Sequence, residues 1–475
     1  MKKKLILFGA GNMGKKALKQ YGKENVAFFC DNNPTKIGTT YEGVEIVSFD
    51  EMLNRYSNDY FIMITPTEKK YLLGQLESAG IIDYLFYEKS EQDRIEIVSC
   101  GAEWRWDDVL DEYSQRCEEL DLLADSRVFC EYICEIKQLI KEHGIPHYSG
   151  RLWESRNYGN LRVLSDYAGC SREDEYYFPE VSHINCVPVY SAEFYKTAVV
   201  FSGNYYKARI HKRFPYVPVF IVGPYIHYAE GIYSEQEMLE QKNKNGRTLL
   251  VFLPHNEEIV SREYERNKFV GDIRRVYGDN YETILLCVFW VDLNAEIIEC
   301  AEMNGIKVVT AGFRFDQRFD RRLRSIIDLA DEVICADMGT FIPYSLCLGK
   351  PIGRMKVNNL KSLSEAESQI SNNKNVQLTK DYYYFEQMFH SVLLEEPMIN
   401  ESILDWMDPF AGFSEIKSRE YIRCIFEISR DLLLESKGEL WDYPVAVRNV
   451  FRKYCTHNDL QKMIALKQAT GVYLN

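Results

Sequence analysis

The chain has 475 residues, enough for about three domains of ordinary size. Its 57 Lys and Arg stand against 71 Asp and Glu, and the resulting net charge of −14 argues against a protein that follows a nucleic-acid backbone through a broad basic face. Because 46% of the residues are apolar and 13% aromatic, the composition also excludes a disordered chain.

The first 90 residues alternate strand and helix patterns. Apolar runs predict strands at 4–8, 26–30, 60–65 and 84–87. Helical periodicity predicts helices at 15–21, 52–56 and 68–79. Such alternation indicates parallel βαβ units.

Two further segments follow this first unit. Helices are predicted at 106–123, 126–143 and 236–247, with buried strands at 198–201 and 217–222. A second α/β series then predicts strands at 248–253, 283–289, 307–310, 332–335 and 350–353. After about residue 375 the pattern is helical, at 382–394, 418–434 and 457–468. The predicted fold class is therefore α/β, with a small Rossmann-like N-terminal domain, two Rossmann-like halves and a helical C-terminal region.

Cysteine usage and apolar runs bear on location and on metal binding. Thirteen cysteines include no CxxC pair and no zinc-finger spacing, so we expect a reducing compartment and no metal site. The basic and then apolar N-terminus has too short an apolar run for a secretion signal, and no stretch approaches 18 apolar residues. We expect a cytoplasmic protein.

A glycine fingerprint lies at the start of the chain. Gly9, Gly11 and Gly14 match GxGxxG directly after the first predicted strand, and Asp31 ends the second one. Such glycines bring a pyrophosphate close to the N–H groups of a helix start, and the acidic residue accepts hydrogen bonds from a ribose. The pattern predicts a nucleotide-binding fold; whether the unit binds a ligand or serves packing or regulation stays open.

The segments FGAGNMGKKAL, VAFFCDNNPTKIGTTYEGVEIVSFDEML and FIMITPTEKKYLLGQLESAGIIDYLFY resemble the N-terminal domain of bacterial sugar O-acyltransferases. The resemblance covers about 90 residues and implies a module that holds a nucleotide-sugar without hydride transfer.

A second glycine turn follows the predicted strand 332–335. Gly339 and Thr340 precede a short helix and the sequence Gly-Lys-Pro, and their N–H groups and hydroxyl are candidates to hold a diphosphate. The order of elements over 180–375 resembles GT-B glycosyltransferases and related polyol-phosphate transferases. The two glutamates of the retaining members are absent, since the matching positions hold Ala336 and Tyr344. Tyr344 either contacts the ribose or packs on the sheet.

Further phosphate contacts are predicted in the same half. Arg314 and Arg318 follow the strand at 307–310, where they either face a phosphate or pair with Asp316 and Asp320. His255 follows the strand at 248–253, where the GT-B resemblance implies a loop facing the cleft. It either hydrogen-bonds to the donor phosphate or the acceptor, or has no role.

The middle half offers candidates for the general base. His183 has a carboxylate three residues before it, Glu180, that would orient it. His227 follows the strand at 217–222 and is a second candidate. Either histidine could instead have a packing role without taking part in catalysis. Trp153 and the run 156–160 are candidates to contact an acceptor sugar.

Together these features predict a metal-independent glycosyltransferase-like enzyme of bacterial surface-polysaccharide synthesis. It would move a sugar or polyol-phosphate from a nucleotide-activated donor to a glycan or lipid-linked glycan, with no required cofactor, no nucleic-acid partner and peripheral contact with the inner face of the membrane. The predicted domains are 1–90, nucleotide-sugar-binding type; 91–245, acceptor side with a helical lead-in; 246–375, donor side; and 376–475, helical. The alternatives are a non-catalytic nucleotide-sugar-binding scaffold and an NAD-dependent oxidoreductase or epimerase.

Overall fold

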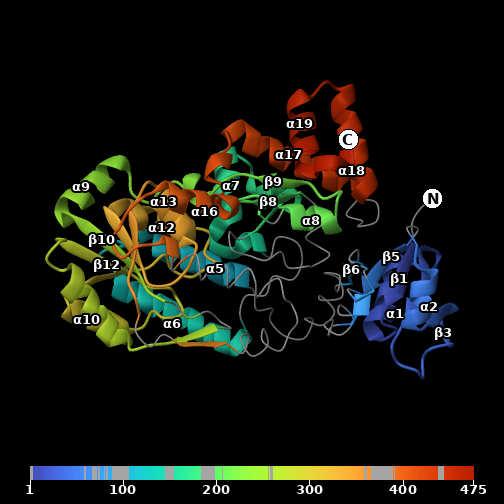
Figure 1. The fold of residues 1–475 in the computed structure, drawn as a ribbon, viewed down its shortest axis with the longest axis horizontal. Coiled ribbons are helices and arrows are strands. Elements are labelled where there is room, and N and C mark those ends of the chain that lie inside the picture. The colour runs from blue at the N-terminus through green and yellow to red at the C-terminus, as the bar shows by residue number, and fades with distance from the viewer. Residues whose placement is uncertain are drawn as a thin grey trace.

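The computed structural model describes residues 4–57, 60–66, 72, 75–76, 78–79, 81, 84–87, 106–144, 154–182, 198–205, 207–254, 256, 260–357, 361–364, 389, 391–436 and 443–474. The predicted helices 68–79 and 382–394 lie largely outside these residues. The predicted α/β class is confirmed, with three separate sheets of mainly parallel strands (Figure 1).

The N-terminal domain is a six-stranded sheet in the order β3-β4-β2-β1-β5-β6, parallel except for the β3–β4 pair. Four apolar side chains of β1 are buried, because β1 is a central strand and helices α1 and α2 pack on the sheet. The elements are β1 (Lys4–Phe8), α1 (Asn12–Tyr21), β2 (Val26–Cys30), β3 (Thr40–Tyr41), β4 (Val44–Val47), α2 (Phe49–Arg55), β5 (Tyr60–Ile64) and β6 (Tyr84–Phe86).

The middle unit is a parallel three-stranded sheet, β7-β8-β9, flanked by helices. All of its described strand residues are buried. The elements are η3 (Glu154–Gly159), α7 (Asn160–Ala168), η4 (Arg172–Tyr177), β7 (Glu180–Val181), β8 (Val199–Phe201), α8 (Lys207–Arg213), β9 (Val219–Ile221) and η6 (Tyr225–His227).

The C-terminal unit is a parallel five-stranded sheet in the order β13-β12-β10-β14-β15. The chain adds strands to one side of β10 and then moves to the other side with β14, the order of a doubly wound sheet. The elements are α9 (Glu235–Asn245), β10 (Thr248–Phe252), β11 (Val260–Glu263), α10 (Arg266–Tyr277), β12 (Thr283–Cys287), α11 (Ala295–Met303), β13 (Lys307–Val309), α12 (Phe319–Leu329), β14 (Glu332–Cys335), α13 (Phe341–Cys347), β15 (Ile352–Arg354) and β16 (Lys361–Ser364).

Helices also lead into and follow the two halves. The lead-in helices are α5 (Trp106–Arg116) and α6 (Ser126–His143), with η2 (Cys117–Glu119) between them. The C-terminal ones are α16 (Glu401–Ala411), η7 (Phe413–Glu415), α17 (Arg419–Ser436), α18 (Tyr443–Thr456), α19 (Leu460–Thr470) and η8 (Gly471–Leu474). α17 packs on α7 of the middle unit, whereas α16 contacts α13 of the C-terminal unit. No helix within the described ranges is both long and apolar enough to cross a bilayer.

The single helix predicted over 106–123 is instead α5 followed by a turn. The carboxylate of Asp121 accepts hydrogen bonds from the N–H groups of Leu123 and Ala124, at 2.7 and 3.1 Å. Such local bonds compete with helix, so after α5 and η2 the chain does not continue as a helix through 121–124.

The lead-in helices precede the middle unit in the chain but pack on the C-terminal one. Lys137 of α6 donates to the carbonyl of Leu293 at 2.8 Å, and Tyr113 of α5 accepts from Phe313 N–H at 3.0 Å. Ser114 of α5 donates to Asp316 at 2.9 Å. On its other side Asp316 pairs with Arg322, and both side chains are at most 2% exposed.

Because removing one partner of a buried ion pair leaves an uncompensated charge, Arg322→Met should lower the free energy of unfolding by about 3–5 kcal/mol. The measurement is urea denaturation followed by tryptophan fluorescence, to which Trp290 contributes from this unit, its ring centroid 4.9 Å from that of Phe313. Arg127→Met is the matched control, since it breaks an exposed pair with Glu302 and should cost less than about 1 kcal/mol. Equal effects of the two substitutions would show that the buried pair does not hold this unit.

Candidate functional site

The carboxyl ends of β10 and β14 form the topological switch point of the C-terminal sheet. The two strands are adjacent, and Ala336 N–H donates to the carbonyl of Phe252 at 3.1 Å. In open α/β sheets ligands bind in the crevice at such a point. The predicted turn of Gly339 and Thr340 lies here and is half-exposed.

The shape of this turn depends on glycine. Phe341 stacks on Phe252, with ring centroids 4.3 Å apart and an interplanar angle of 6°. A Cβ atom on Gly339 would overlap the Phe341 ring, so any larger residue displaces the stack. His255, predicted to face the same crevice, lies outside the described residues.

A buried carboxylate that the sequence analysis did not single out holds the loop after β10. Asp292, 5% exposed, accepts from the backbone and side-chain amides of Asn256 at 2.8 and 2.6 Å and from Arg266 at 2.6 Å. The sequence could have marked Asp292 by its position in the loop after strand β12, since loops at the carboxyl edge of such a sheet contact ligands.

Tyr344 lies inside the molecule. The residue is 2% exposed, and its hydroxyl is 3.4 Å from Oδ2 of Asp320 on α12. Burial raises the pKa of Tyr344 and also that of Asp320, which pairs with no cation among the described residues. Tyr344 thus occupies the packing position that the sequence analysis left open, between α12 and α13.

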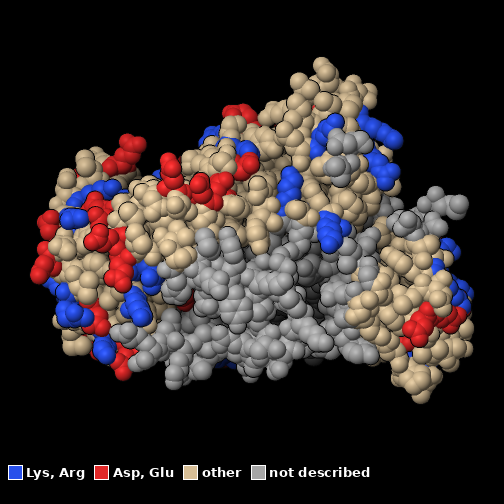
Figure 2. Space-filling view, viewed as in Figure 1, with Lys and Arg blue, Asp and Glu red and all other residues tan. Residues whose placement is uncertain are grey.

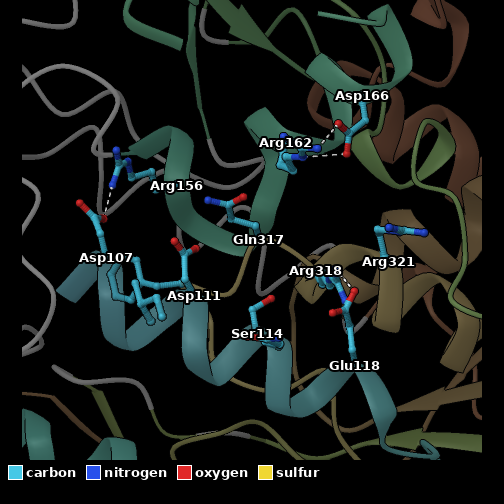
Figure 3. A pocket seen from close by; sticks show the side chains of 13 residues that line it. Asp107, Asp111, Ser114, Glu118, Arg156, Arg162, Asp166, Gln317, Arg318 and Arg321 are labelled. Carbon is cyan, nitrogen blue, oxygen red and sulfur yellow. Dashed lines mark hydrogen bonds and ion pairs between the residues drawn. The ribbon is translucent and has the colours of Figure 1, made fainter. Parts of the chain in front are cut away.

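A pocket of ≈ 330 Å³ lies between α5, the η3–α7 segment and the start of α12 (Figure 3). Four carboxylates and four guanidinium groups line it, so its formal charge is balanced. The lining residues are Asp107, Leu110, Asp111, Ser114, Gln115, Glu118, Arg156, Arg162, Asp166, Phe315, Gln317, Arg318 and Arg321. Within the described part of the chain, no three His, Cys, Asp or Glu side chains gather as metal ligands would.

The pocket arginines are paired with protein groups. Arg156 lies 2.8 Å from Asp107 and Arg162 lies 2.7 Å from Asp166. The predicted phosphate contact Arg318 pairs with Glu118, and Arg321 donates to the carbonyl of Glu230 at 3.1 Å. Arg314, the other predicted contact, packs its guanidinium over the ring of Phe315 at 4.8 Å.

The interface between the two halves, beside this pocket and called the seam below, contains buried polar groups that have no hydrogen-bond partner among the described residues. Asn160 is fully buried, and both polar atoms of its amide are unpaired within the described ranges, as are Oδ1 of Asn157 and Oδ1 of Asp320. Between the two asparagines, Tyr158 has a left-handed φ of 61°, a strained conformation. Because unpaired buried groups are rare, this seam is a place where a polar ligand or water is expected.

The residues of the middle half that were predicted to act as general base, or to orient it, differ in solvent exposure. Glu180 is 1% exposed and accepts from Ser155 at 3.1 Å, whereas His227 is exposed at the end of η6. Desolvation and the neighbouring Arg324 lower the pKa of His227, which keeps its imidazole neutral at pH 7. His183 lies outside the described residues.

In the N-terminal domain the glycine turn has the expected position, and Asp31 has partners of its own. Gly9 adopts a φ of 114°, and a Cβ on Gly14 would overlap the carbonyl oxygen of Gly9. Gly11 has open space beside it. The Asp31 carboxylate accepts from the N–H groups of Ala10 and Asn33 and from Lys36, at 2.7, 2.8 and 3.0 Å.

No protein-family model and no curated protein sequence matches the chain. Among solved structures, it is similar to a putative UDP-N-acetylglucosamine 2-epimerase from Listeria monocytogenes, with 12% identity, a TM-score of 0.26 and coverage of 92% of this chain and 96% of that one. It is also similar to UDP-GlcNAc 2-epimerase from Neisseria meningitidis bound to UDP-GlcNAc, with 11% identity, a TM-score of 0.26 and coverage of 91% and 99%. The wall teichoic acid polymerase TagF is similar as well, with 11% identity, a TM-score of 0.28 and coverage of 92% of this chain and 90% of that one. Scores this far below 0.5 assign no activity to the chain.

The hydrogen bonds to Asp31 predict how the N-terminal domain responds to acid. Burial alone raises the pKa of Asp31, but the bonds from Asn33, Lys36 and Ala10 outweigh it and lower the pKa below its ordinary value. The stability from this carboxylate is therefore full above the unfolded pKa near 4 and is lost as the pH falls through the lower folded pKa. Asp31→Asn should unfold with less pH dependence in this acid range than the wild type. Parallel acid-unfolding curves from both proteins would contradict the assignment; Asp50→Asn, on α2, is the control.

Proposed function

We propose that the chain is a metal-independent transferase that binds a nucleotide-activated donor at the switch point and transfers a sugar or polyol-phosphate from it to a glycan acceptor. The observation that carries this proposal is the half-exposed Gly339–Thr340 turn at the carboxyl ends of β10 and β14. Backbone N–H groups and a hydroxyl at this point of a doubly wound sheet suit the diphosphate of such a donor.

The transfer chemistry needs a base on the acceptor and a stabilised leaving group. The acceptor oxygen displaces a nucleoside diphosphate from the anomeric carbon of a sugar donor, or a nucleoside monophosphate from the phosphorus of a polyol donor. Either displacement requires removal of a proton from the acceptor hydroxyl, and we assign this step to a neutral histidine, with His227 and His183 as the candidates. The backbone dipoles of the Gly339–Thr340 turn would take up the charge that develops on the leaving phosphate. The buried Glu180, which accepts a hydrogen bond from Ser155, would hold the segment before His183 in place.

We place the glycan acceptor in the pocket between α5 and α12. Three of its four guanidinium groups are already paired with three of its carboxylates, so an anion gains little there. A sugar hydroxyl both donates and accepts, and can therefore insert between such groups without displacing a charge. Asp111 and Gln317 line the pocket, and neither side chain is hydrogen-bonded to another described side chain. The unpaired amide of Asn160 lies in the adjoining seam.

A specific observation favours a second function, a non-catalytic nucleotide-sugar-binding scaffold. The arginines predicted to hold the donor phosphate are engaged by the protein itself: Arg318 by Glu118 and Arg314 by Phe315. The NAD-dependent alternative gains no support from Asp31, because its carboxylate already has three donors.

Thr340→Val should weaken donor binding by about 10- to 100-fold, the effect of removing one hydrogen bond to a charged group. Calorimetric titration with a panel of nucleotide-sugars and nucleotide-activated polyols measures it, and release of the nucleoside phosphate measures turnover. Thr456→Val, at an exposed position of α18, is the control. Full binding and turnover by Thr340→Val would place the donor elsewhere; donor binding without turnover on any acceptor would favour the scaffold.

Gly11→Trp tests whether the N-terminal turn takes part. A Cβ atom on Gly11 would have no other atom within 4 Å, so the side chain starts in open space beside the turn, where its ring would block a ligand. We expect turnover to change by less than about threefold, which is under 1 kcal/mol. Loss of turnover with an unchanged melting temperature would show that the catalytic donor site is the N-terminal one.

Asp111→Asn should raise KM for the glycan acceptor by about tenfold while kcat and donor affinity stay near the wild-type values, since the residue lines only the acceptor pocket. Asp108→Asn, exposed on the same helix and outside the pocket lining, is the matched control. A fall in kcat with unchanged KM, or an equal effect of both substitutions, would contradict this placement of the acceptor.

A further inference from the structure

The end of the chain carries positive charge, in contrast to the whole. Residues 443–475 include five Lys or Arg and one acidic residue, Asp459, although the net charge of the chain is −14. Figure 2 shows Lys and Arg gathered over α18 and α8, with no Asp or Glu among the described residues that this view shows there.

Contacts around the last turn, η8, join α8, α18 and α19 into one surface. Arg448 of α18 donates to the hydroxyl of Tyr473 at 2.8 Å, and Lys207 of α8 donates to the carbonyl of Gln468 at 2.9 Å. The exposed basic residues of this surface, which we call the basic face, are Lys212, Arg448, Arg452, Lys453 and Lys467.

Large apolar side chains are exposed among these charges. Val445, Leu460 and Ile464 are 51%, 58% and 44% exposed, while the opposite sides of α18 and α19 are buried. Both helices pack on α17. The solvent-facing side of the α18–α19 pair therefore presents apolar and basic residues together.

The acidic groups nearby leave most of this charge uncompensated. Asp431 pairs with Lys453 at 3.3 Å, and Glu427 and Asp459 pair with Lys462, which is not part of the basic face. Arg452 and Lys467 make no ion pair with any described residue.

We propose that the basic face docks the protein on an anionic lipid bilayer. A cluster of four to eight basic residues on an amphipathic helical surface is attracted to acidic headgroups, and exposed apolar side chains beside it enter the boundary with the acyl chains. A soluble polyanion would use the charges but leaves Val445, Leu460 and Ile464 without a partner. The inference is independent of the proposed catalytic activity.

Sedimentation of the full-length chain with vesicles tests this. The wild type should bind vesicles of equal parts phosphatidylcholine and phosphatidylglycerol, and not phosphatidylcholine alone, with binding that falls as salt rises. Arg452→Ala with Lys467→Ala should partition about 30-fold more weakly, since each charge contributes about fivefold. Neither side chain has an ion-pair partner among the described residues, so the substitutions break no ion pair there. Arg274→Ala with Arg275→Ala, exposed on α10 at the other end of the molecule, is the charge-matched control.

Leu460→Ser with Ile464→Ser separates a membrane from a soluble polyanion. These substitutions keep every charge, so they should weaken vesicle binding and leave binding to soluble polyphosphate unchanged. Equal binding of the wild type to neutral and acidic vesicles, equal loss in the α10 control, or vesicle binding unaffected by the Leu460 and Ile464 substitutions would each overturn the proposal.

Discussion

The ion pair between Arg322 and Asp316 fixes the segment on which the candidate site depends. Both side chains are almost fully buried, and Asp316 also accepts from Ser114 of α5, far away in the chain. On the other side of the same segment, Tyr158 N–H donates to the carbonyl of Arg314 at 2.6 Å. One loop after β13 therefore holds a lead-in helix and the middle unit together, and the charged pocket lies where they meet (Figure 3).

The proposed donor and acceptor sites differ in the kind of ligand group that each would bind. The Gly339–Thr340 turn offers backbone and hydroxyl groups to a concentrated negative charge. The pocket is already neutral, because its arginines and carboxylates compensate each other, and it favours ligands that both donate and accept hydrogen bonds. The turn follows β14 and the arginine loop follows β13, three strand spacings or about 14 Å away across the sheet. The two sites therefore share an edge of the sheet without sharing residues.

The sequence predicts the elements better than the contacts of their side chains. Buried parallel strands are continuous apolar runs, which is why β1, β2 and β14 match the predicted bounds. The position of Arg318 at the edge of the sheet was predictable, but its pairing with Glu118, 200 residues earlier, depends on α5 folding back onto the C-terminal unit. In the same way the partners of Asp31 include Lys36, a lysine that no motif marks. Asn157 and Asn160 were predicted to contact an acceptor sugar only as members of the run 156–160. That their amide atoms are buried without a described hydrogen-bond partner depends on how the two halves pack, which the sequence does not show.

The most direct test of the account is a crystal structure of the full chain grown with a nucleoside diphosphate. Its phosphates should lie against the backbone of residues 337–340, between the ends of β10 and β14. Phosphates bound at the glycine turn of the N-terminal domain, or in the arginine-lined pocket, would contradict it.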